Sequence, residues 1–134
     1  MNALETALYA RLSGDATLAA LATGGVWRGN APTGTTGSIV AFSQVSGSDD
    51  YSLKQRAMTQ YNYLIKGVTI GESATSAWQI ADRIDTLLTD QTLTLASGSV
   101  MSVRRDTIMS FTEHDGGETY QHAGGYFIIW TQGT

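Results

Sequence analysis

The chain has 134 residues, a length that fits one domain with a real hydrophobic core, so we expect a single domain over residues 1–134. It contains no cysteine, which excludes a disulfide framework, a thiolate metal site and a cysteine nucleophile. The formal net charge is −4 and the basic residues are scattered along the chain, so we expect no tight binding of DNA by the isolated domain.

Two helices are expected at the N-terminal end. Leu4, Leu8 and Leu12 recur every four residues, which predicts a helix over residues 2–12 with one apolar stripe. Asp15 follows directly and can accept a hydrogen bond from a free first-turn amide. We therefore predict a second, short helix that begins after Asp15 and is ended by the Gly-Gly pair that follows.

Extended segments and loops alternate over the next stretch. A short strand is expected to begin at Val26, and a loop with the only proline follows over 29–37. Residues 39–45 and 56–68 are rich in β-forming residues, and we expect strands there with a polar loop over 46–55 between them. One face of the longer strand is more apolar than the other, as expected when one side of a sheet is covered.

The second half of the chain contains the clearest helix. Over 72–89, alanine, leucine and isoleucine fall at three- and four-residue spacing. After it we expect a short strand over 93–95, a long strand over 100–112, a polar loop over 113–121 and a final apolar strand over 126–130.

This order of elements predicts the fold class. Strands lie before and after one long crossover helix, and the other connections have the length of hairpins. The expected fold is α+β, with a mostly antiparallel β-sheet and helices packed on one face. Strand order and register do not follow from the sequence.

The sequence offers little for catalysis or metal binding. His114 lies between Glu113 and Asp115, and His122 follows eight residues later; imidazole and carboxylate are metal ligands, but this spacing matches no strong motif. We therefore favour a solvated acidic loop. No nucleophile elbow, P-loop or H-E-x-x-H motif occurs. We expect no catalytic, cofactor-binding or metal site, and a protein that is not an enzyme.

Two further features leave alternatives open. Adjacent strand residues point to opposite faces, so Arg104 and Arg105 cannot share one face. They are either a surface arginine beside an ion-paired one, or part of a salt bridge between subunits. Trp78 lies in the apolar stripe of the long helix and is expected in the core, whereas Trp130 suits either the core or an interface.

Several short strings, spread over nearly the whole chain, resemble one family. They are, in order, GDATLAALATGGVW, NAPTG, SIVAFSQVSG, ATSAWQIADRIDTLL, VMSVRRDTIM and YFIIW. The sequence is similar in layout to the small tail components of siphophages, the tail-terminator or tail-completion proteins that include lambda-like members.

The resemblance implies a structural virion protein of the tail and neck, assembled in the host cytoplasm. Such subunits form a ring, typically a hexamer, that caps the tail tube and meets the head-completion proteins. The genome passes through the lumen without specific binding. No membrane partner is expected, since no apolar run approaches the ~20 residues of a membrane span. The alternatives are a head–tail connector or stopper, and a small module that binds a ligand or nucleic acid.

The resemblance also directs attention to candidate interface residues. These are Arg104, Arg105, Trp130, Tyr51 and Lys54. Asp49 and Asp50 are candidates for facing the lumen, where negative charge would limit the adhesion of DNA. The three polar loops would reach neighbouring subunits and become ordered on assembly, which favours a monomer in free solution.

Overall fold

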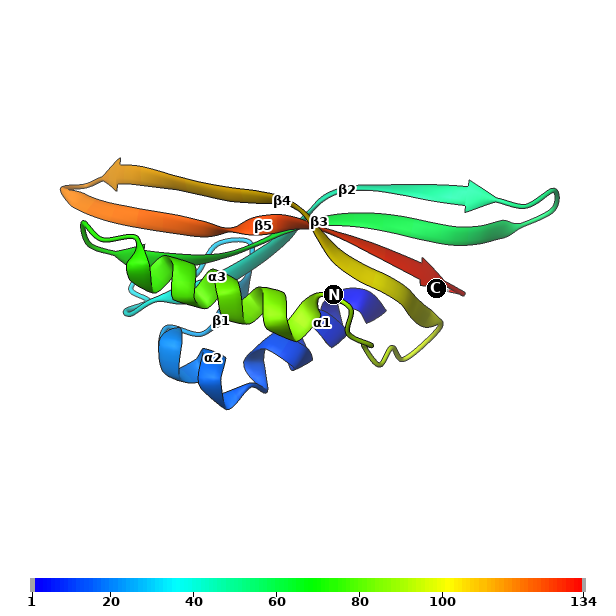
Figure 1. Ribbon diagram of the computed structural model, residues 1–134, viewed down its shortest axis with the longest axis horizontal. Helices are drawn as coiled ribbons and strands as arrows, with labels where there is room; N and C mark the ends of the chain where they lie inside the picture. Colours follow the sequence, from blue (N-terminus) through cyan, green and yellow to red (C-terminus); the bar gives the residue numbers. More distant parts are fainter. Residues whose placement is uncertain (1, 134) are drawn as a thin grey trace.

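The computed structural model describes residues 2–133 and contains one five-stranded sheet with three helices. In chain order the elements are α1 (Ala3–Ser13), α2 (Ala16–Leu21), β1 (Val26–Arg28), β2 (Ile39–Tyr51), β3 (Arg56–Ile70), α3 (Thr75–Leu88), β4 (Ser99–Asp115) and β5 (Glu118–Gln132). The strand order is β1-β2-β3-β5-β4; β1 pairs with β2 in parallel and the other pairings are antiparallel. All three helices lie on one side of the sheet (Figure 1), so the predicted α+β fold is confirmed.

Side-chain caps and ion pairs fix the helices relative to one another. Asp15 caps α2 as predicted, because its carboxylate accepts a hydrogen bond of 2.8 Å from the amide of Leu18. The same carboxylate accepts two hydrogen bonds from Arg83 of α3, at 2.7 and 2.9 Å. The Arg83 guanidinium lowers the pKa of Asp15 to about 2. On α1, the buried carboxylate of Glu5 pairs with Arg28 of β1.

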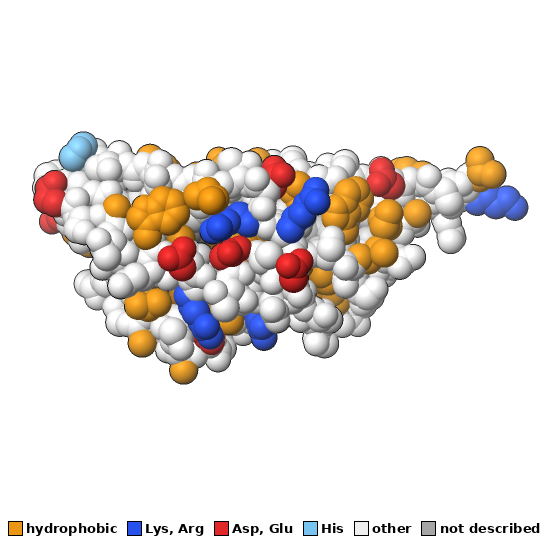
Figure 2. Space-filling model, viewed as in Figure 1, with side chains coloured by type: hydrophobic (Ala, Val, Ile, Leu, Met, Phe, Trp, Pro, Cys, Tyr) orange, Lys and Arg blue, Asp and Glu red, His pale blue; other side chains and the backbone are white. Residues whose placement is uncertain are grey.

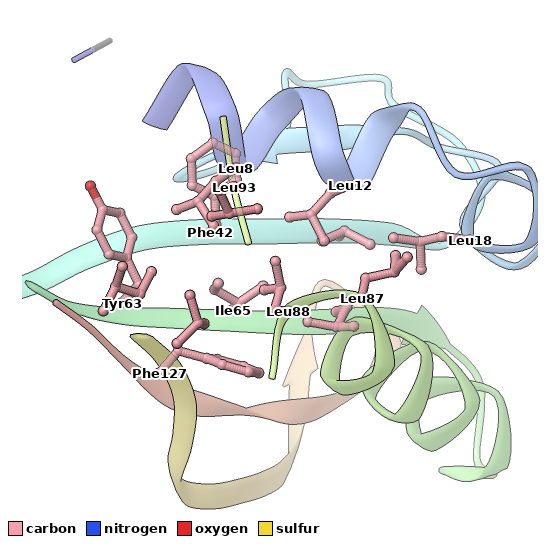
Figure 3. Close-up of a cluster of buried hydrophobic side chains, with 14 of the residues drawn as sticks. Leu8, Leu12, Leu18, Phe42, Tyr63, Ile65, Leu87, Leu88, Leu93 and Phe127 are labelled. Carbon is pink, nitrogen blue, oxygen red and sulfur yellow. The ribbon is translucent and has the colours of Figure 1, made fainter. Parts of the chain in front are cut away.

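The main core lies between the helix layer and the inner face of the sheet. In Figure 3, leucines from the helices point toward aromatic and aliphatic side chains from the strands. The labelled members are Leu8, Leu12, Leu18, Phe42, Tyr63, Ile65, Leu87, Leu88, Leu93 and Phe127, all of them buried. The leucine stripe predicted for the first helix therefore forms the contact between α1 and the sheet.

Helix α3 approaches the sheet closely over a patch of small residues. Gly67 of β3 lies opposite Ala123 of β5, and Ala77 and Ala81 of α3 pack against Ala123. A Cβ atom at Gly67 would lie 2.5 Å from Cγ2 of Ile80, a distance that real side chains do not tolerate. The absence of a side chain at Gly67 therefore sets how closely α3 sits.

Three predictions about strands and loops are wrong. Residues 93–95 form no strand, although Leu93 is buried in the core. The polar segments 46–55 and 113–121 are mostly strand, because β2 extends to Tyr51 and β5 begins at Glu118. Residues 46–55 and 113–118 are exposed on both faces of the strands, so their side chains are polar while the backbone keeps its ladder of hydrogen bonds. The loop predicted over 29–37 is present.

A bulky side chain at Gly67 should separate α3 from the sheet. We expect Gly67→Val to lower the free energy of unfolding by about 1–3 kcal/mol, because overpacking displaces the fully buried Ile80. Thr69→Val is the matched control: it is on the same strand and face, and its buried hydroxyl has no hydrogen-bond partner within residues 2–133. This control should be neutral or stabilising. Urea denaturation measures the free energy of unfolding of both variants. Equal values for Gly67→Val and Thr69→Val would refute the close contact between α3 and the sheet at Gly67.

Candidate assembly surface

The face of the sheet opposite the helices is uncovered, and we call it the open face. Alternation along the paired strands assigns it the even-numbered side chains of β5 from Tyr120 to Trp130 and those opposite them. Leu64 and Thr107, for example, flank Tyr126 on either side. Helices cover only the other face in Figure 1. The open face is therefore a broad surface that the helices of this chain leave uncovered.

Many side chains of the open face are apolar. They include Ile39, Leu64, Val68, Met109, Phe111, Tyr126, Ile128 and Trp130, all half-buried or exposed. Exposed apolar patches beyond a few hundred Å² are rare on monomeric proteins and usually mark an interaction site. A sheet face of this composition is therefore expected to pack against another protein surface.

One end of the open face is hollowed. A hollow of about 410 Å³ is lined by Ile39 and Ala41 from β2, Leu64, Lys66 and Val68 from β3, Tyr120 and His122 from β5, Glu113 and Asp115 from β4, and residues 29–31 of the preceding loop. Residues from both edges of the sheet line it, so the open face is concave there. Gly124 fits this curvature, since a Cβ atom at that position would lie 2.5 Å from the Cα of Lys66.

A packed polar cluster forms one side of this hollow. The rings of Phe111 and His122 stack with their centroids 4.1 Å apart, and Nζ of Lys66 lies 5.2 Å from the Phe111 centroid. Nε2 of His122 lies 2.9 Å from a carboxylate oxygen of Glu113. Burial lowers the pKa of His122, and the nearby Lys66 charge acts in the same direction, while Glu113 opposes it. Burial also lowers the pKa of Lys66.

The hairpin of β2 and β3 extends past the rest of the sheet as a two-stranded ribbon. Strand β5 pairs with β3 only from Thr59 onward, and Thr59 lies opposite Asp49, so residues 49–58 form what we call the arm. Tyr51 is 70% exposed and Leu53, in the turn, is fully exposed. Within the arm, Asp49 accepts a hydrogen bond of 2.7 Å from Thr59 and lies 3.9 Å from Arg56. An isolated two-stranded hairpin is marginally stable in water, so the arm is expected to gain stability from a partner.

The structure separates the two candidate arginines. Arg104 is exposed on the open face, whereas Arg105 points to the helix side, where its guanidinium lies 3.6 Å from Asp85 of α3. Arg105 thus has an ion pair within the chain. Trp130 is half-buried on the open face, at the end of β5. A role for any of them between subunits stays a prediction.

The other candidates lie on the arm. Tyr51 is paired with Arg56 at its tip and Lys54 lies in the turn, whereas Trp130 lies opposite Gln60, four residues along β3 from Arg56. Asp49 and Asp50 are adjacent on β2, so their side chains project to opposite faces of the arm. A channel lined by one face of the arm would therefore meet only one of the two carboxylates.

The predicted solvated loop around the histidines is wrong for His122. Its side chain is only 8% exposed and stacked on Phe111, whereas His114 is exposed at the hairpin tip. Within residues 2–133, no three histidine, aspartate or glutamate side chains are grouped as metal ligands. The cluster of His122, Phe111 and Lys66 was missed because its members come from three strands and meet only once the register is known.

Fold and surface together define an α+β domain built for protein–protein assembly. A family model described as "Tail completion protein gp17" matches residues 6–129, nearly the whole chain, and the chain belongs to this family. The predicted resemblance is thereby confirmed. The protein is a structural component of a phage-type virion, acting in tail completion, and its family is structural and not enzymatic.

Solved structures share the fold at low sequence identity. One chain of a structure titled "Virion of native gene transfer agent (GTA) particle" matches with a TM-score of 0.83 and 20% identity, covering 98% of this chain and 96% of that one. A second solved structure matches with a TM-score of 0.59 and 15% identity, covering 98% and 94%. No curated protein sequence matches this chain. None of the helices within residues 2–133 has the length and apolar content of a membrane span.

The lowered pKa of His122 should make the fold sensitive to mild acid. The folded state takes up a proton at His122 less readily than the unfolded chain does. The stability contributed by neutral His122 is thus complete above the unfolded pKa of about 6.5 and is lost as the pH falls through the folded pKa. We expect His122→Phe, which keeps a ring against Phe111, to lose less stability than the wild type between pH 7.5 and 5.

Urea denaturation across this pH range measures the difference. His114→Gln serves as the control, because this exposed histidine should leave the pH profile of the wild type in place. If the free energy of unfolding had the same pH dependence in His122→Phe and the wild type, His122 would not be the source of the acid sensitivity.

Proposed function

We propose that the protein is the ring-forming tail terminator of a long-tailed phage-like particle. In this proposal, copies of the chain form a ring, typically a hexamer in this kind of protein, that caps the finished tail tube. The other side of the ring joins the head-completion proteins. The observation that carries the proposal is the open face with its projecting arm, in a chain of the tail completion protein gp17 family.

The geometry supports assembly through more than one contact. The open face offers a broad apolar surface, and the arm offers a second, separate surface beyond the body of the domain. Contacts between two different surfaces of the same chain are heterologous, and they generate rings when the rotation closes. A ring also leaves surfaces free above and below it, one for the tube and one for the head side.

The charge of the chain suits a channel for DNA. The net charge is −4, and negative walls limit adhesion of a genome that must slide through. Asp50 is the better lumen candidate on the arm, because Asp49 already accepts a hydrogen bond from Thr59 and lies near Arg56. The lumen assignment is part of the proposal.

The direct test is to mix the purified protein with polymerised tail-tube protein and to image the mixture by negative-stain electron microscopy. We expect a ring at one end of the tubes. Ile128→Asp, in the middle of the open face, should abolish it, because a charge there prevents apolar packing. Tyr9→Asp, on the outer side of α1, is the matched control and should cap tubes normally.

Other outcomes would redirect the assignment. Bare tube ends, together with rings on portal or adaptor complexes, would make the protein a head–tail connector or stopper. Binding to neither would favour a module for a small ligand or nucleic acid. Circular dichroism of Ile128→Asp must show a folded chain for the comparison to count.

Charge reversal at Asp50 tests the lumen. We expect particles carrying Asp50→Lys to release their DNA more slowly, because a ring of cations would hold the phosphates. Thr6→Lys adds the same charge on an exposed position of α1 and is the control. Release rates measured by dye uptake at two salt concentrations should differ most at low salt. Equal rates for all three particles would exclude Asp50 from the lumen.

A further inference from the structure

The two ends of the long sheet differ in chemistry. The turn of the arm carries Leu53 and Lys54, and the projection at the right of Figure 2 ends in hydrophobic and basic side chains. The hairpin of β4 and β5 carries Glu113, Asp115 and Glu118, and the left end of Figure 2 shows acidic and histidine side chains. The turn at the arm tip is therefore basic and apolar, with Asp49 and Asp50 further back along the arm, and the opposite end of the sheet is acidic.

The hollow of the open face lies at the acidic end. Ile39, Leu64 and Val68 form its apolar surface. The carboxylates of Glu113 and Asp115 outnumber the one ammonium group of the lining, that of Lys66, which lies over the Phe111 ring. The wall opposite these carboxylates comes from the loop that contains Pro32, which also borders the adjoining depression. Such a hollow is suited to an apolar side chain that is followed by a cation.

The arm tip presents that combination. Leu53 is fully exposed beside Lys54, in a turn that is closed by a hydrogen bond of 2.8 Å from the amide of Ser52 to the carbonyl of Gln55. Burial of this exposed leucine by a partner would be favourable, because it removes apolar surface from water.

The tip cannot fill the hollow of its own chain. Arg56 begins β3 beside the tip, and Val68 near the other end of β3 lines the hollow. Twelve residues of extended strand, at about 3.3 Å each, separate them by roughly 40 Å. The occupant that carries this tip must therefore be another copy of the chain.

We infer that the arm tip of one copy docks into the hollow of the next copy around the ring. Leu53 packs against Ile39, Leu64 and Val68, and Lys54 faces Glu113 and Asp115. The inference rests on the proposed function, since it requires a ring of identical subunits. Contact between two like ends would oppose cation to cation or carboxylate to carboxylate, so charge favours a head-to-tail arrangement, which generates a ring when the rotation closes.

Cross-linking on assembled tubes tests the contact. Because the wild-type chain has no cysteine, Leu53→Cys and Val68→Cys introduce the only thiols. With a short bismaleimide reagent, the double variant should give a ladder of covalent oligomers, and a mixture of the two single variants should give dimers. The pair Tyr9→Cys and Val68→Cys places one thiol on the helix side and should give no ladder.

A charge exchange gives a second readout. We expect Lys54→Glu and Asp115→Lys each to reduce capping of tubes roughly tenfold, and the double variant to restore it, because opposite charges again face each other. Rings on tubes without cross-links or charge rescue would overturn the docking while leaving the tail-terminator function in place. Absence of rings with the wild-type chain would overturn both.

Discussion

The close contact between α3 and the sheet determines where the other helices pack and which face of the sheet stays uncovered. Gly67 and Ala123 leave room for Ala77, Ala81 and Ile80 of the helix, so α3 lies flat on the inner face. Helices α1 and α2 then pack beside it, fixed by the bond between Asp15 and Arg83. With every helix on one side, the core is complete and the opposite face is left for partners.

Because the strands differ in length and in register, the two ends of the sheet differ in structure. The hairpin of β2 and β3 continues beyond β5 at one end, and that of β4 and β5 turns at Gly116 and Gly117 at the other. The ends therefore differ in shape as well as charge: one is a projecting ribbon, the other a hollow with acidic side chains. A subunit with two unlike, complementary ends can pass the same contact on from copy to copy, which a symmetric dimer contact cannot do.

The sequence predicted the parts of the fold that depend on local patterns. The leucine stripe of α1, the cap at Asp15 and the helix around Trp78 follow from spacing and capping chemistry, and all are present. The hairpin ends were predicted as loops because an exposed strand carries polar residues on both faces, as a loop does. The hollow and the cluster around His122 depend on pairing between distant strands, and no local pattern contains that register.

The outer edge of β4 is poorly suited to pairing with another chain, which leaves the open face and the arm tip as the surfaces for assembly. This strand of 17 residues is an edge, and long edges invite pairing with other chains. Two irregularities interrupt its register, between Val100 and Ser102 and between Arg105 and Thr107. Bulges and charged side chains such as Arg104 and Asp106 discourage edge-to-edge addition of strands. The chain thus discourages open-ended growth of the sheet through this edge while keeping an apolar face and a projecting tip available for contacts with other proteins.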